Sequence, residues 1–140
     1  MEDLVGLWES APYDYGTMES SWLCLRADGT GWSAWANAAG GASISRFTWA
    51  RPRDGELDLQ YHWTASGSWT SDTQTTTPPS LIEIDEEGPD HSFIHTGHTI
   101  KVDTTPLTEQ PITALHLGTA IECAHQFGLA TRDPAVDDPA

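Results

Sequence analysis

Three of the six histidines lie close together in the sequence, at His91, His95 and His98. Imidazole nitrogens are common zinc ligands, and a zinc site needs several ligands that converge in a roughly tetrahedral arrangement. The four-residue step between His91 and His95 can place both rings on one face of a strand or helical turn. Gly97 and the shorter step to His98 would require a turn to bring the third ring round. We therefore expect surface histidines and no metal site.

A group of carboxylates precedes these histidines, at Glu83, Asp85, Glu86 and Glu87. It lacks the Asp-x-Asp-x-Asp-Gly pattern of a calcium-binding loop. Paired acid–base catalysis would require one carboxyl group to be buried with a raised pKa, which an exposed run does not provide. We interpret the group as a solvated acidic edge that discourages pairing between sheets.

His62 lies beside Asp58 and Gln60 on the polar face of a predicted strand at residues 56–64. The alternate positions of this strand are apolar, so the polar face is expected to meet solvent and His62 is not expected to be a buried acid or base. The chain has no nucleophile elbow, P-loop or dinucleotide-binding motif. The sequence thus predicts no catalytic residues and favours a protein that is not an enzyme.

The elements that would position these residues are short strands that follow one another closely. Strand 56–64 alternates most clearly, with Leu57, Leu59, Tyr61 and Trp63 on the apolar face. The other predicted strands cover residues 4–10, 20–27, 30–37, 44–50, 80–86, 91–96 and 98–104. Such a series predicts an antiparallel meander.

Two segments have mixed signals. Residues 65–80 form a Ser/Thr-rich loop in which Trp69 is expected to anchor the loop to the body of the protein. Residues 109–127 have the early Pro and the following Gly128 of a helix, although their β-branched residues favour a strand. We favour the helix.

The strongest hairpin signal is Asp28-Gly29. If its turn has two residues, Leu25 lies opposite Trp32 and Trp22 lies opposite Trp35; a three-residue bulged turn would shift this pairing by one. The residues expected to share the face of Leu25 are Leu23, Trp32 and Ala34. The Trp22/Trp35 pair would form an apolar patch on the other face, covered by the C-terminal helix, by a second copy in a homodimer or by another protein.

The first half of the chain resembles the lipocalin-like (calycin) superfamily of small bacterial proteins. The residues that carry the resemblance are Gly6-Leu7-Trp8, Leu23-x-Leu25-x-x-Asp28-Gly29-Thr30-Gly31, Trp49 and Leu57-x-Leu59. The resemblance implies that Trp8 closes one end of a barrel and that a basic residue near the last strand, here Arg132, packs across it. Glu9-Ser10 depart from the Gly-x-Trp-x-Gly run of haem-binding relatives, so we expect neither haem nor another cofactor.

The expected architecture is therefore all-β: an antiparallel, up-and-down, lipocalin-like barrel of seven to nine strands over residues 1–132, with a possible helix packed outside. Residues 133–140 are acidic and Pro-bearing, and we expect a disordered tail.

The charge of the chain limits its partners. The 140 residues include 21 acidic and six basic residues, a formal net charge of −15. Such a surface repels phosphates and anionic lipid headgroups, so nucleic acid and membrane partners are not expected, whereas a basic protein is an electrostatic match. The acidic start Met1-Glu2-Asp3 does not resemble a signal peptide, so we expect a cytoplasmic protein in which Cys24 and Cys123 are reduced thiols.

The first functional hypothesis is non-catalytic binding of a small, mostly apolar ligand in the barrel. The residues expected to line the site are Trp32, Phe47, Trp49, Leu59, Tyr61 and Trp63. The alternatives are an acidic interaction or inhibitor protein for a basic partner, and a cyclase or isomerase that acts in an apolar barrel pocket. A barrel filled by its own side chains would bind no ligand.

Overall fold

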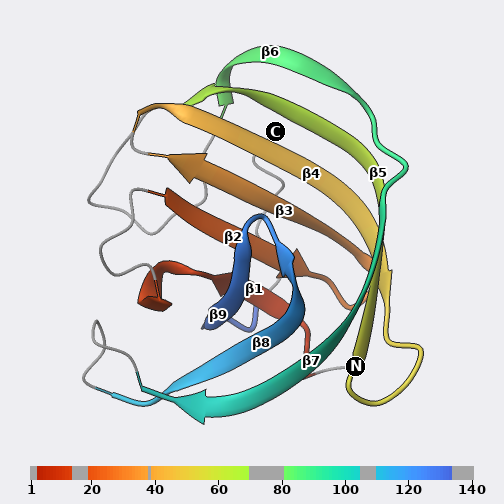
Figure 1. Ribbon diagram of the computed structural model, residues 1–140, viewed down its shortest axis with the longest axis vertical. Helices are drawn as coiled ribbons and strands as arrows, with labels where there is room; N and C mark the ends of the chain where they lie inside the picture. The colour runs from red at the N-terminus through yellow and green to blue at the C-terminus, as the bar shows by residue number, and fades with distance from the viewer. Residues whose placement is uncertain (1–2, 14–18, 38, 70–80, 105–109, 134–140) are drawn as a thin grey trace.

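A computed structural model describes residues 3–13, 19–37, 39–69, 81–104 and 110–133, and these residues are almost entirely β-structure (Figure 1). The strands are β1 (Gly6–Glu9), β2 (Glu19–Leu25), β3 (Thr30–Asn37), β4 (Gly41–Ala50), β5 (Glu56–Trp69), β6 (Leu81–Pro89), β7 (Phe93–Asp103), β8 (Ile112–Ile121) and β9 (Ala124–Thr131). One short 3-10 helix, η1 (Ala11–Tyr13), follows β1.

Eight of the strands close into an antiparallel barrel. The hydrogen-bonded ring runs β1-β2-β3-β4-β5-β7-β8-β9 and returns from β9 to β1. Ring neighbours are consecutive in the chain except at two places: β5 pairs with β7, because β6 stands between them in the sequence, and β9 pairs with β1 to close the ring. The structure thus confirms the predicted all-β, up-and-down barrel.

β6 lies outside this ring, and its pairing explains why. β6 and β7 are both antiparallel to β5, and they pair with successive parts of this strand, Trp63–Trp69 and Glu56–Gln60 respectively. Between them, the His62 carbonyl accepts from the Asp90 amide and the Tyr61 amide donates to the Ser92 carbonyl. β6 is therefore an extension of β7 along β5, and no other described strand pairs with its second edge.

The helix predicted at residues 109–127 is wrong, because the described part of this segment forms β8 and the start of β9. The apolar residues of this segment lie on both faces of the sheet, so their spacing along the sequence resembles that of a helix. Leu115 and Phe127 face the barrel interior, whereas Ala114 and Gly128 face η1, whose Pro12 packs on Gly128. The β-branched residues of this segment have high strand propensity and so favour a strand over a helix.

The hairpin between β2 and β3 has the three-residue turn rather than the two-residue one. The Arg26 amide donates to the Thr30 carbonyl, Gly29 has a φ of +87°, and the Asp28 carboxylate accepts from the amide and hydroxyl of Thr30. Leu25 consequently lies opposite Gly31.

This shift of one residue exchanges the faces of the whole of β3. Trp22 lies opposite Ala34, and Trp35 lies opposite Ser21, so the predicted Trp22/Trp35 pair is not formed. Trp32 falls on the outer face with Trp22, whereas Trp35 falls on the inner face with Leu23 and Leu25. Trp22 is only 4% exposed, so it offers no free patch to a second copy or a partner.

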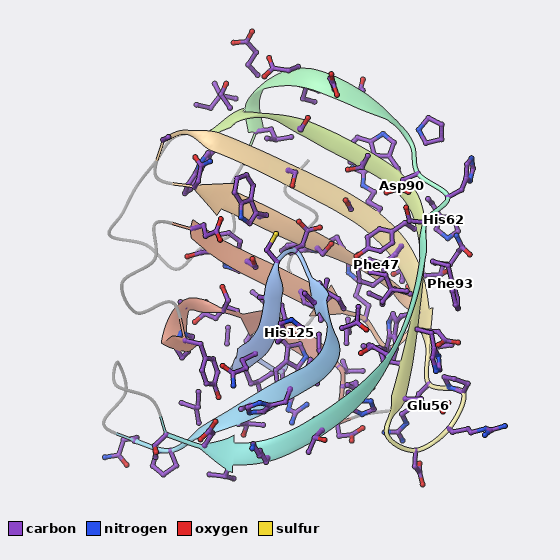
Figure 2. The ribbon with its side chains drawn as sticks, in the orientation of Figure 1. Phe47, Glu56, His62, Asp90, Phe93 and His125 are labelled. Carbon is purple, nitrogen blue, oxygen red and sulfur yellow. The ribbon has the colours of Figure 1, made fainter. Side chains whose placement is uncertain are left out.

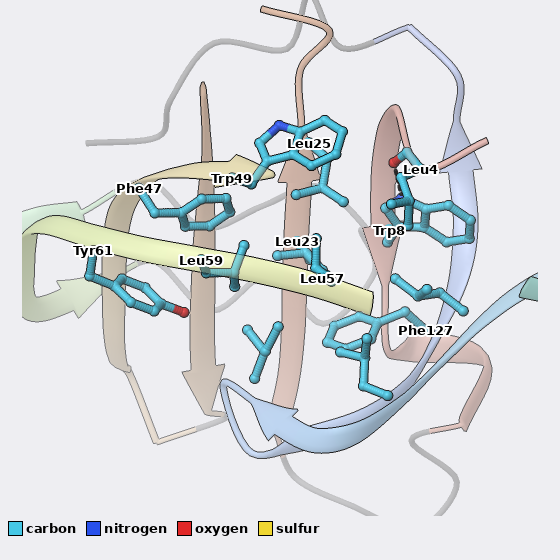
Figure 3. Packing of buried hydrophobic residues seen from close by; sticks show 13 residues of the cluster. Leu4, Trp8, Leu23, Leu25, Phe47, Trp49, Leu57, Leu59, Tyr61 and Phe127 are labelled. Carbon is cyan, nitrogen blue, oxygen red and sulfur yellow. Dashed lines mark hydrogen bonds between the residues drawn. The ribbon is translucent and has the colours of Figure 1, made fainter. Parts of the chain in front are cut away.

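The inner cluster fills one end of the barrel with buried apolar side chains (Figure 3). Its members are Leu4, Trp8, Leu23, Leu25, Phe47, Trp49, Leu57, Leu59, Tyr61, Leu115, Leu117, Ile121 and Phe127. The Trp8 indole N–H donates to the Leu4 carbonyl at 2.9 Å. The Arg132 guanidinium lies 5.6 Å from the Trp8 ring centroid, which is the contact that the family resemblance implied.

An outer cluster is buried on the opposite face of β1–β5. Its members are Leu7, Trp22, Cys24, Trp32, Ala34, Ala36, Ala42 and Ile44, with Trp63, Trp69 and Leu81 packed against them. The predicted loop is wrong at residues 65–69, which form the end of β5; Trp69 is the last residue of this strand, and its indole N–H donates to the Asn37 carbonyl at 3.0 Å. The rest of the predicted loop, at 70–80, and the predicted tail from 134 onward lie outside the described residues.

Candidate functional site

The barrel interior changes from apolar to polar along four adjacent strands. The inner face of β2 passes from Leu23 to Ser21, that of β3 from Gly31 to Ser33, and that of β4 from Phe47 to Ser45. The inner face of β5 likewise passes from Tyr61 to Thr64. We call the half that contains these hydroxyl side chains, together with Ser43, the polar end of the barrel. Ser33 is 0% exposed, so this polarity is internal.

The change on β5 occurs at a β-bulge. Phe47 of β4 lies opposite Tyr61 and Arg46 lies opposite Trp63, so His62 is the extra residue on β5. The bulge keeps Tyr61 on the inner face and moves Trp63 to the outer face. Thr64 then points inward, where its Oγ1 lies 3.0 Å from Ser45 Oγ.

The hairpin between β8 and β9 reaches into the polar end from the other side of the ring (Figures 1 and 2). β8 leaves β7 after Leu117, and the Thr119 amide then donates to Thr96 Oγ1 at 2.8 Å. The tip is a two-residue loop between Ile121 and Ala124, with Glu122 and Cys123 at its centre.

Both central residues of this loop have positive φ, 51° at Glu122 and 66° at Cys123. The left-handed region is unfavourable for side-chain-bearing residues, and such a turn normally has Asn or Gly here. Backbone strain of this kind concentrates at functional sites, because the surrounding structure must hold it in place.

Serine hydroxyls hold the hairpin tip through Glu122. Ser21 Oγ donates to the Glu122 carbonyl at 2.6 Å, and Ser33 Oγ donates to its carboxylate Oε1 at 2.9 Å. Ser43 also hydrogen-bonds to the carboxylate. Burial raises the pKa of the Glu122 carboxyl above its ordinary value, and the hydrogen bonds from Ser33 and Ser43 offset only part of this effect.

No basic side chain neutralises Glu122. All six Lys and Arg residues belong to the described part of the chain. Arg132 packs on Trp8, Arg46 lies over the Trp63 ring at 4.2 Å, and Arg51 pairs with Asp3 at 2.9 Å. The hydroxyls of Ser33 and Ser43 lower the pKa of the Glu122 carboxyl against the larger effect of burial. The interior therefore holds a partly buried carboxyl group without a counter-ion.

Two aromatic residues border the polar end. Tyr61 is buried, its ring meets Phe47 edge-to-face at 5.5 Å, and its hydroxyl hydrogen-bonds to Ser33. Burial, and to a lesser extent the nearby Glu122 carboxylate, raise the pKa of Tyr61 to about 12, so the phenol keeps its proton. Trp35 is half-buried on the inner face, and its indole N–H donates to Glu19 at 2.9 Å.

Described residues line two pockets that are open to solvent. One of about 200 Å³ lies between η1, the start of β2 and the start of β9, and its lining includes Glu19, Ser21 and His125. The other, of about 230 Å³, lies between Thr64–Ser66 of β5 and Glu86–Pro89 of β6. Neither lining includes Lys or Arg, and both include carboxylates.

The residues predicted to line a ligand site separate into two groups. Phe47, Trp49, Leu59 and Tyr61 lie in the inner cluster. Trp32 and Trp63 belong to the outer cluster instead, because of the turn at Asp28-Gly29 and the bulge at His62. The sequence reasoning missed Glu122 and the serines. Serines at alternate positions of predicted strands were the available signal for a polar interior face.

The histidines do not converge on a site. His95 Nδ1 forms an ion pair with the exposed Asp58 carboxylate, and His62 lies 3.0 Å from Thr48 Oγ1 on the exterior. In the described residues no group of three or more His, Cys, Asp or Glu side chains could hold a metal ion. Cys24 is buried and Cys123 is exposed, and no disulfide joins these two cysteines.

Comparison with protein-family models, with curated proteins and with solved structures finds no match to this chain. The class defined by the fold is therefore that of a closed antiparallel β-barrel with a polar end. Among the described residues, no helix has the length and apolar character needed to cross a membrane.

Proposed function

We propose that this barrel is a non-catalytic binding protein for a small, mostly apolar molecule that carries one polar group. The observation that supports this proposal is the partly buried Glu122 carboxyl, placed inside the barrel and hydrogen-bonded to Ser33. Burying a carboxyl group is costly unless it is hydrogen-bonded or paired, and a few placed polar groups beside aromatic walls are characteristic of ligand sites. The inner cluster would contact the apolar part of the ligand through Phe47 and Tyr61.

Membership of the lipocalin-like superfamily and a cytoplasmic location are parts of the same proposal. The contact between Trp8 and Arg132 supports the first, because it is the end-closing arrangement that the resemblance implies. The lack of a disulfide between Cys24 and Cys123 supports the second, because reducing compartments disfavour disulfides.

Native mass spectrometry of the protein from its own host lineage tests the proposal. We expect a bound small molecule that dissociates on activation. Ser33→Ala and Thr64→Val, which alter the polar end, should reduce its occupancy. Thr48→Val is the matched control, because Thr48 lies on the exterior of the neighbouring strand. Bare polypeptide, together with no binding in a small-molecule screen, would contradict the proposal.

A cyclase or isomerase would use the same site, with the Glu122 carboxyl as the group that transfers a proton. Turnover of a bound molecule, measured as a change in its mass or structure on incubation, distinguishes this candidate from simple binding. An enzyme would lose turnover in Glu122→Gln while still retaining the substrate.

A second candidate function is binding of a basic protein along β6. Three of the four exposed large apolar residues of the described chain lie at this edge: Ile82 (67% exposed), Ile84 (46%) and Phe93 (57%). No strand of the described residues pairs with the second edge of β6, and the acidic side chains of β6 suit an extended basic segment that adds a strand.

Titration with an alternating Lys/Val peptide tests this candidate. Affinity should fall steeply with salt and should be weaker in Ile84→Lys, whereas Val102→Lys, at an exposed apolar position far from β6, should bind normally. Equal affinity for both variants would contradict a β6 site.

A further inference from the structure

We infer that the polar group of the ligand is a protonated amine, which binds the Glu122 carboxylate at the polar end of the barrel. The inference rests on the proposed function and adds the chemical class of the ligand. It is based on three features of the site: the missing counter-ion, the unused acceptor capacity of the carboxylate and the absence of basic residues around it.

The missing counter-ion is the first feature. A carboxylate removed from water is strongly disfavoured unless a positive charge or several donors compensate it. At Glu122 the compensation consists of the neutral hydroxyls of Ser33 and Ser43. Every Lys and Arg of the chain is described, and none contacts this carboxyl. A positive charge supplied by a ligand would complete the site.

The acceptor capacity of the carboxylate is the second feature. An ionised carboxylate can accept about four hydrogen bonds, and the Ser33 and Ser43 hydroxyls supply two of them. An ammonium group has only donors and carries the compensating charge, so its hydrogen bonds to the remaining positions would be charge-assisted. An alcohol or amide could donate to the same positions but would leave the charge in place.

The surroundings of the site are the third feature, and they select against anions. The cavity next to the hairpin contains Glu19, the cavity beside β6 contains Glu86 and Glu87, and the chain as a whole has a net charge of −15. Long-range attraction of this sign concentrates cations near the barrel. The half-buried Trp35 and the Tyr61 ring provide aromatic surfaces beside the carboxyl group, which suits an amine attached to an apolar or aromatic body.

The protonation of Glu122 itself provides an independent prediction. The groups that face its carboxyl from the packed strands are Ser33 of β3, Ser43 of β4 and Tyr61 of β5, and Tyr61 keeps its proton at neutral pH. A bound ammonium group favours the ionised carboxylate, so a fraction of the protein should release a proton on binding. Affinity should accordingly fall as the pH is lowered through the pKa of Glu122.

Calorimetric titration with matched probes tests the inference. The probes are phenethylamine, its neutral analogue 2-phenylethanol and its anionic analogue 3-phenylpropionate. We expect phenethylamine to bind about tenfold or more tightly than 2-phenylethanol, with little binding of the anion. Glu122→Gln should remove this preference. Glu83→Gln, which makes the same change on the exposed β6, should keep it.

The outcomes separate the inference from the proposed function. Equal binding of the amine and the alcohol, or an unchanged preference in Glu122→Gln, would overturn the amine inference while the binding site remained. No binding of any probe or of library compounds would overturn both. If Glu122→Gln does not fold, the wild-type protein suffices, because amine affinity that does not change between acidic and neutral pH would also overturn the inference.

Discussion

Glu122 is the residue at which the stability of the fold and the proposed binding function oppose one another. Its carboxyl group is ionised in the unfolded chain at neutral pH, whereas burial in the folded chain favours the protonated form. On folding at neutral pH, the Glu122 carboxyl must therefore either take up a proton or be buried as a charged carboxylate. Neither the sequence position of Glu122 nor its neighbours indicated this, because the charge is internal only as a result of the hairpin that carries it.

The first prediction concerns the pH dependence of stability. The folded-state pKa of Glu122 is raised, so the folded protein binds more protons between the unfolded and folded pKa values. Its unfolding free energy should fall as the pH rises through that window. Glu122→Gln should remove this decline and be more stable at pH 7 by on the order of 1 kcal/mol. Urea unfolding across the acidic range measures the difference, which should vanish below the unfolded pKa.

A second prediction at this scale concerns Arg132. Its guanidinium donates to the carbonyls of Asp3 and Val5 and lies over the Trp8 ring. Arg132→Ala should lower the unfolding free energy by about 1–2 kcal/mol, through the loss of these hydrogen bonds and the cation–π contact. Arg132→Lys should recover only part of it. Thermal unfolding measures the effect, and a loss no larger than that of Arg53→Ala, in the exposed turn before β5, would contradict it.

At the scale of elements, the hairpin tip and β6 depart furthest from regular geometry. The tip has two side-chain-bearing residues with positive φ, at Glu122 and Cys123. β6 is in close contact with β5, because a Cβ at Gly67 would lie 1.9 Å from the Glu83 carbonyl oxygen. Each irregularity allows a specific test.

Cys123→Gly should stabilise the hairpin. Glycine adopts the left-handed conformation without the steric penalty of a Cβ, so the unfolding free energy should rise by about 1 kcal/mol, less the entropy that glycine gains in the unfolded chain. Chemical denaturation measures the change, and Cys24→Ala, in the buried outer cluster, should be destabilising by contrast. Destabilisation by Cys123→Gly would show that the tip is not strained.

Gly67→Ala should separate β6 from β5 without opening the ring. The added methyl group would overlap the β6 backbone, whereas the ring pairings of β5 with β4 and β7 do not involve that contact. Hydrogen exchange should show faster exchange in β6 and unchanged protection in β3. Gly88→Ala is the matched control on β6, since a Cβ there meets nothing within 4 Å. Faster exchange in both variants would contradict the prediction.

The positions of the strands could be predicted from the sequence better than the face of the sheet on which each side chain lies. The clear alternation from Leu57 to Tyr61 and the Asp28-Gly29 turn identified real strands and a real hairpin. The length of that turn, and the bulge at His62, each shift register by one residue, and a shift of one residue exchanges the two faces of a strand. The site could not be predicted because it depends on these two shifts and on the long-range contact between Glu122 and Ser33.

At the scale of the whole molecule, the excess of acidic residues affects both stability and association. With 21 acidic residues against six basic ones and a net charge of −15, the folded chain is under mutual repulsion. Salt should relieve this repulsion, because the screening length is only a few ångströms at high ionic strength.

The prediction at this scale is therefore that salt stabilises the protein. The thermal midpoint should rise by a few degrees between about 0.01 M and about 0.5 M NaCl, since roughly 1 kcal/mol corresponds to a few degrees for a domain of this size. Differential scanning calorimetry measures it. A falling midpoint would mean that attractive ion pairs, such as Arg51–Asp3, outweigh the repulsion.

The tip of the β8–β9 hairpin also has a mechanical role. β8 and β3 occupy opposite positions in the ring of eight strands, and the hydrogen bonds from Ser21 and Ser33 to Glu122 connect these two sides. The tip is thus a cross-brace at one rim of the barrel. A molecule that binds the remaining acceptor positions of the carboxylate adds to the side-chain half of this brace, while the bond from Ser21 to the backbone stays in place. Occupancy of the polar end and stiffness of its rim are consequently governed by the same few hydrogen bonds.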